Sequence, residues 1–127
     1  MSCKVCNIIA STNYQNAGYR QTENYVFYQR AYELKRRKRE CIADTKELQA
    51  YLKGLWVKQG MLCYYTGIKM ELTGYHTTPY AMTVDRLDSS KGYIRDNMVL
   101  CLAVINRIKQ DLTIKELKDW VNLINTV

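Results

Sequence analysis

The sequence lacks the features that are typical of multidomain, membrane-spanning and secreted proteins. It has one proline in 127 residues, and no repeat, low-complexity block or Pro/Gly-rich stretch predicts a linker between domains. No apolar run approaches the roughly 18 residues of a membrane-spanning helix. Residues 1–6 lack the apolar segment of a secretory signal. We therefore expect an intracellular, soluble protein with one core of ordinary size, in the cytoplasm, or in a nucleus or viral context if its basic segment is an import signal.

Cysteine and histidine are too few, or too scattered, for a complete structural zinc site. The five cysteines are an odd number, which argues against a disulfide framework in an intracellular chain. Cys3 and Cys6 have zinc-ligand spacing, but no second such pair exists and His76 is the only histidine. The other cysteines stand alone and are expected to be buried or inert: Cys41, Cys63 and Cys101.

Positive charge is abundant and uneven. The net charge is +7, of which +6 lies in residues 1–60 and +1 in residues 61–127. This imbalance favours a polyanionic partner, most commonly nucleic acid, although an anionic membrane surface or a merely solvated helix end would also accommodate it. The residues expected to contact phosphate are Arg30, Lys35, Arg36, Arg37, Lys38, Arg39, Lys91 and Lys109.

Hydrophobic periodicity predicts an α+β fold. Helices are expected over residues 25–39, from Asp44 to Gly60, over 102–109, and from Thr113 onward, where Glu116 completes a capping box. The last helix would place Leu117, Trp120, Val121 and Ile124 on one apolar face. Strands are expected over 61–65, 82–84 and 98–101. Residues 1–60 would form a basic helical region packed on a core made by residues 61–127.

The densest polar cluster follows the second expected strand, over residues 84–97. Asp85 ends that strand, and Asn106 on the next helix follows Asn97 by nine residues. A hairpin folded onto a helix could bring Asp85 and Asn106 together, and their hard oxygen atoms suit Mg²⁺. The alternative is a polar hairpin loop beside a helix that carries an ordinary asparagine.

These residues give the chain a recognisable pattern. Residues 61–117 resemble the HNH, or ββα-metal, endonucleases in the pair Asp85-Arg86, in Asn97 and in Asn106. The stretch Cys63-Tyr64-Tyr65-Thr66-Gly67 is similar to the opening Cys-x-x-Cys-Gly of that family. The resemblance implies a metal-dependent DNA endonuclease with a ββα-metal core between the basic helices and a C-terminal helix. It also implies that Asp85 and Asn106 hold one divalent cation, Mg²⁺ or Mn²⁺.

The pattern departs from the family at the general base. The usual histidine after the aspartate is Arg86 here, as in an Asp-Arg subset that includes a restriction enzyme. In that subset a tyrosine is proposed as the base, and the matching residue is Tyr93. Arg86 would favour its phenolate or hold a phosphate oxygen, and Asn97 would brace the loop. His76 is the alternative base.

Zinc is not expected. In zinc-containing relatives, Cys63 and Cys101 would each have a cysteine partner, but Thr66 and Val104 stand at those positions. Two thiols do not complete a tetrahedral site.

The sequence also allows other functions. The same fold could be a catalytically inactive nucleic-acid-binding module, a branched-DNA resolvase, or a structural protein with an incidental basic segment. DNA is the expected partner and a membrane is not. A homodimer would supply a second active site for cutting both strands of a duplex.

Overall fold

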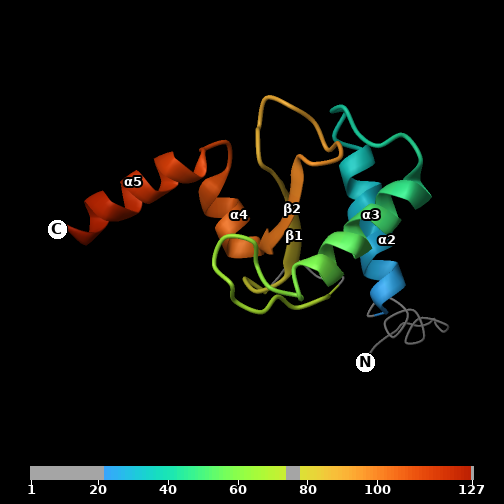
Figure 1. Cartoon of the computed structure of the whole chain (residues 1–127), viewed down its shortest axis with the longest axis horizontal. Helices are drawn as coiled ribbons and strands as arrows, with labels where there is room; N and C mark the ends of the chain where they lie inside the picture. The colour runs from blue at the N-terminus through green and yellow to red at the C-terminus, as the bar shows by residue number, and fades with distance from the viewer. Residues whose placement is uncertain (1–21, 74–77, 127) are drawn as a thin grey trace.

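The computed structural model describes residues 22–73 and 78–126. In these residues the fold is α+β, with helices on both sides of a two-stranded antiparallel sheet (Figure 1). The elements in chain order are α2 (Glu23–Lys35), α3 (Thr45–Lys58), β1 (Met82–Arg86), β2 (Met98–Leu102), α4 (Ala103–Lys109) and α5 (Ile114–Asn125).

The helices α2 and α3 pack side by side and carry part of the core. Both begin at capping residues, since the side chains of Thr22 and Asp44 accept backbone N–H groups of their first turns. The rings of Phe27 and Trp56 meet edge to face with centroids 6.1 Å apart. One cluster of buried side chains joins these two helices to both strands. The basic N-terminal region and the sheet therefore share a hydrophobic core.

The predicted extension of the first helix to residue 39 is wrong. Helix α2 ends at Lys35, and Arg36 forms its C-cap. Lys38 then adopts a positive φ of 56°, a left-handed conformation that an α-helix does not continue through. The basic segment is therefore mostly a turn after the helix.

The hairpin of β1 and β2 leads directly into α4. The strands pair antiparallel with Asp85 opposite Val99, and α4 begins immediately after β2. The N–H of Ala103 donates to the carbonyl of Ala81 at 2.9 Å, which fixes the start of α4 beside the start of β1. Both strand predictions and the helix prediction are confirmed here, apart from their ends.

The strand predicted over residues 61–65 is wrong. This stretch reverses direction at Gly67, which has a φ of 73°, and the Cys63 N–H donates to the Ile68 carbonyl at 2.8 Å. Only an isolated bridge between Leu62 and Lys69 has strand-like pairing. The turn closes before a longer ladder can form, and it places Tyr64 and Tyr65 beside the hairpin.

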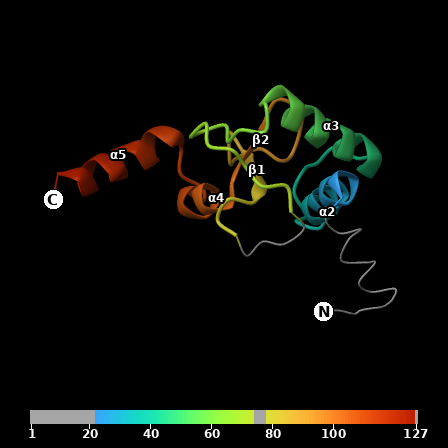
Figure 2. The ribbon, with the colours of Figure 1, turned by 90° about the horizontal axis from the view of Figure 1, so that it is seen from below.

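Helix α5 has the predicted capping box, but its apolar face is not packed. Thr113 and Glu116 cap each other reciprocally. The helix buries none of its residues, and Trp120 and Ile124 are 59% and 69% exposed. Figures 1 and 2 both show α5 projecting away from the rest of the fold. Among the described residues, no helix combines the length and apolarity that crossing a bilayer requires.

Candidate functional site

The hairpin and α4 bring Asp85 and Asn106 to one face of β1. Thr83 and Asp85 are two residues apart on the strand, so their side chains point to the same face. The Asn106 amide nitrogen donates to Thr83 Oγ1 at 3.1 Å and to the Val84 carbonyl at 3.2 Å. Because both contacts use Nδ2, the amide oxygen of Asn106 is the atom left to bind an ion.

Lys109 reaches the same face from α4. It lies one turn after Asn106, so the two side chains project from one side of the helix. Its Nζ is 3.1 Å from Asp85 Oδ2, and the two side chains are only 3% and 7% exposed. Lys109 is therefore the buried counter-ion of Asp85. The expectation that it contacts phosphate from the surface is corrected by this burial.

Tyr65 is the second group that contacts the Asp85 carboxylate. Its hydroxyl donates to Asp85 Oδ2 at 2.5 Å, and its ring lies 5.8 Å from the Lys109 ammonium. Burial, and then the hydrogen bond to Asp85, raise the pKa of the Tyr65 phenol far above its usual range. Tyr65 therefore holds and orients Asp85 as a neutral donor, which makes it unsuited to accept a proton from water.

Arg86 does not lie with Asp85. Successive side chains leave a strand on opposite faces, so Arg86 points away from the Asp85 carboxylate. One of its nitrogens donates to the carbonyls of Ser89 and Lys91 at 2.6 and 3.0 Å, and the other lies 3.6 Å from the Asp111 carboxylate. The guanidinium thus holds the loop between the strands, and its fork is occupied by protein atoms.

Tyr93 is buried beside Arg86 and is likewise separated from Asp85. It is 5% exposed, its ring lies 5.5 Å from the Arg86 guanidinium, and its hydroxyl accepts a hydrogen bond from Arg37 at 2.8 Å. A general base must reach the water it activates. This placement does not support the expected assignment of Tyr93 as that base, because its side chain is buried and its hydroxyl is already hydrogen-bonded to Arg37.

Asn97 closes the loop between the strands. Its amide oxygen accepts the Asp88 N–H at 2.9 Å, and its amide nitrogen donates to the carbonyls of Asp88 and Gly92 at 3.1 and 2.9 Å. The side chain is buried and all three bonds are internal to the loop. Asn97 therefore braces the loop, as expected from the sequence, and these hydrogen bonds serve the loop rather than a catalytic role.

The same loop docks on the segment that follows the basic turn. The Tyr93 N–H donates to the Glu40 carbonyl at 2.7 Å. A Cβ atom on Gly92 would lie 2.0 Å from that carbonyl oxygen, so only glycine permits this approach. The docking brings Lys91 into the neighbourhood of the basic turn.

The eight expected phosphate contacts divide into two groups. Arg30 is 3% exposed and donates to the carbonyls of Met82 and Thr73 at 3.0 and 2.9 Å, so its surface role is corrected to a core one. Lys35 donates to the carbonyls of Ile42 and Ala43. The side chains exposed to solvent, here called the basic set, are Arg36, Arg37, Lys38, Arg39 and Lys91.

The thiols of Cys63 and Cys101 are both buried in the core. Burial raises the pKa of Cys101 to about 12, which keeps its thiol protonated near neutrality.

Within residues 22–73 and 78–126, no group of three or more His, Cys, Asp or Glu side chains could hold a metal ion. Cys3, Cys6 and His76 lie outside the described residues.

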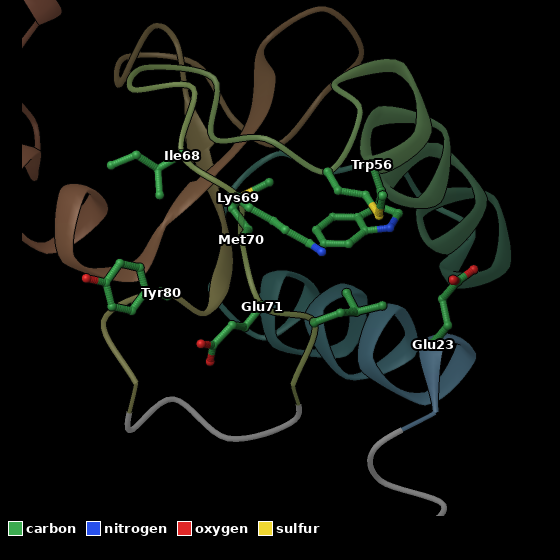
Figure 3. Close-up of a pocket in the computed structure, with 9 residues that line it drawn as sticks. Glu23, Trp56, Ile68, Lys69, Met70, Glu71 and Tyr80 are labelled. Carbon is green, nitrogen blue, oxygen red and sulfur yellow. The ribbon is translucent and has the colours of Figure 1, made fainter.

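Among the hollows in the described part of the chain, one adjoins the candidate site and a larger one lies apart from it. One, of about 450 Å³, adjoins the site through Tyr65 and Lys109 and is also lined by Tyr64, Leu87, Ile114 and Lys118. The other, of about 780 Å³, is largely apolar and is lined by residues of α2, α3 and the 61–72 segment together with Tyr80. Figure 3 shows Trp56 and Tyr80 at its opposite sides, with Lys69 and Met70 between them. It contains none of the site residues expected from the sequence.

The sequence pattern missed Tyr65 and the pairing of Lys109. Tyr65 stands inside the stretch that resembles the family's opening motif, but nothing in its spacing points to Asp85. Lys109 follows Asn106 by three residues, and that helical spacing was the one signal that could have placed both on the same face.

No protein-family model matches this sequence, and comparison with curated proteins and with solved structures gave no significant match.

Proposed function

We propose that this chain is a metal-dependent DNA endonuclease that hydrolyses phosphodiester bonds at the Asp85 site. The observation that carries the proposal is that α4, which follows the hairpin directly, holds the Asn106 side chain against the strand that carries Asp85. This arrangement agrees with the ββα-metal resemblance in the order of its elements and in the residues that it brings together.

The donor set suits one hard divalent cation. Asp85 supplies a carboxylate and Asn106 an amide oxygen, the ligand types that Mg²⁺ and Mn²⁺ accept alongside water and phosphate. Bound there, the ion would supply Lewis-acid stabilisation of charge developing on the phosphodiester oxygens. Tyr65 keeps the Asp85 carboxylate in a fixed orientation through its 2.5 Å hydrogen bond.

The basic set gives the proposed enzyme a means of holding DNA. Its exposed cations lie on the turn after α2 and on the hairpin loop docked against the segment after that turn. Contacts from such side chains to phosphates give affinity that falls with salt and does not depend on sequence. A homodimer remains a prediction.

The proposal is tested with supercoiled plasmid in Mg²⁺, with an EDTA control. Asp85→Asn is the informative variant, because it removes the charge and keeps a side chain of the same shape beside Tyr65 and Lys109. Asp119→Ala is the matched control, since Asp119 is an exposed carboxylate of α5 that pairs with Lys115. We expect nicking by the wild type and by D119A, and its loss in D85N and in EDTA. Cleavage by D85N at the wild-type rate would refute the assignment.

An inactive DNA-binding module is the second candidate. It is favoured by the buried ion pair that neutralises Asp85 and by the burial of Tyr93 away from it. This candidate predicts a salt-sensitive gel shift without cleavage of any DNA form in Mg²⁺ or Mn²⁺. A panel of duplex, flap and four-way-junction DNA in the same assay also tests for a resolvase.

A further inference from the structure

The Asp85 carboxylate already has a cation within the protein. Lys109 Nζ lies 3.1 Å from Asp85 Oδ2, and both side chains are buried. The Tyr65 hydroxyl donates to the same oxygen. A divalent ion that approached this face would meet an ion pair with no net charge, and it would be repelled by the ammonium at short range.

A hollow beside Lys109 offers its side chain a second position. Both Lys109 and Tyr65 line the hollow of about 450 Å³ beside the site. The lysine ammonium sits on a flexible four-carbon stem, so it can turn from Asp85 into this hollow without movement of α4. In the hollow its ammonium would no longer pair with Asp85.

We propose that Lys109 is an exchangeable counter-ion of the metal site. It pairs with Asp85 when the metal is absent, and it releases that carboxylate to the divalent cation when the metal binds. This inference rests on the proposed function, because it takes Asp85 as the metal ligand. Lys109 is thus a positioning residue whose competition weakens metal binding by the free protein and favours loading when DNA phosphates draw the ammonium away.

The test is the affinity of the DNA-free protein for Mn²⁺, measured from the electron paramagnetic resonance signal of the unbound ion. Lys109→Met removes the charge and keeps an unbranched side chain of similar length. Lys118→Met is the matched control, since Lys118 lines the same hollow but makes no ion pair with Asp85 among the described residues. We expect K109M to bind Mn²⁺ at least about tenfold more tightly than the wild type, and K118M to stay within about twofold.

The gain must also depend on Asp85. We expect the double variant K109M/D85N to lose the tight binding. Equal Mn²⁺ affinity in the wild type and K109M would overturn the inference, as would an equal gain in K118M. Neither result would decide the endonuclease proposal, which depends on plasmid cleavage. Conversely, an Asp85-dependent gain in K109M with no cleavage by the wild type would support the exchange and refute the nuclease.

Loss of Lys109 leaves the Asp85 carboxylate buried without a cation, so K109M could fail to fold in the absence of metal. Thermal unfolding with and without Mn²⁺ covers that case. A cooperative transition that appears in K109M only when Mn²⁺ is added would support the exchange, because the ion then replaces the lost ammonium. A chain that stays unfolded in Mn²⁺ would overturn it.

Discussion

Arg30 and Arg39 belong to the same basic segment of the sequence, yet the structure predicts opposite consequences for their loss. Arg30 is 3% exposed and donates to two backbone carbonyls, those of Met82 and Thr73. These bonds tie α2 to β1 and to the segment before it. Arg39 is exposed on the turn after α2. Replacing each arginine by methionine removes the same charge and keeps an unbranched stem.

The expected cost of Arg30→Met follows from its two charged hydrogen bonds. Each such bond contributes about 1.5–3 kcal/mol, so leaving both carbonyls without their donor should lower the free energy of unfolding by about 3–6 kcal/mol. With a typical urea dependence for a small domain, this moves the unfolding midpoint down by about 2 M. Arg39→Met should change the free energy of unfolding by less than about 0.5 kcal/mol.

Urea unfolding followed by tryptophan fluorescence provides the measurement. Trp56 is buried against Phe27 and reports the core, whereas Trp120 is already largely exposed. A gel shift at low salt completes the comparison, and there only R39M should weaken DNA binding, provided that R30M is folded. Equal stability of R30M and R39M would refute the reasoning. It would mean that the hydrogen bonds of Arg30 stabilise the fold no more than water bound to the same carbonyls does.

Three further predictions concern the loop and the core. Asn97→Asp should destabilise the chain more than Asn97→Ala in the same urea assay, because a carboxylate would face the Asp88 and Gly92 carbonyls; equal losses would contradict the bracing role. Tyr93→Phe should keep the proposed plasmid nicking within a few-fold and lower the free energy of unfolding by about 1 kcal/mol through loss of the Arg37 bond; abolished nicking in a folded variant would restore Tyr93 as the base. Burial raises the pKa of Cys101 from 9.0 to about 12, so its contribution to stability is full below pH 9 and falls as the pH rises toward 12; melting temperatures between pH 8 and 11 should fall less steeply in Cys101→Ala than in the wild type.

The sequence predicted local structure well where the signal is local. The capping box at Thr113 and Glu116, the two paired strands and the helix after them follow from neighbouring residues. It failed where a backbone conformation decides the outcome. The positive φ of Lys38 ends the basic helix early, and the reversal at Gly67 replaces an expected strand. Neither change alters the hydrophobic pattern that predicted those elements.

The candidate site was predicted only in part for a related reason. Asp85 and Arg86 are neighbours in the motif, but a strand sends neighbouring side chains to opposite faces. One face of the hairpin therefore joins Asp85 to Asn106 and Lys109, whereas Arg86 and Tyr93 pack together elsewhere and organise the loop.

The separation of Arg86 from Asp85 bears on how the proposed nuclease could function with Arg86 in place of the histidine. If Arg86 had taken the place of the histidine in chemistry, its guanidinium would be free to face a phosphate; instead it holds two loop carbonyls and the Tyr93 ring. The groups that do surround the Asp85 carboxylate are Lys109 and Tyr65, and both act on the same oxygen. The residues that contact the Asp85 carboxylate therefore come from α4 and from the turn before Gly67. Variants of Lys109 and Tyr65 should alter metal binding more than variants of the loop. Arg86→Met provides the contrast: we expect it to loosen the loop and lower stability while leaving Mn²⁺ affinity near that of the wild type.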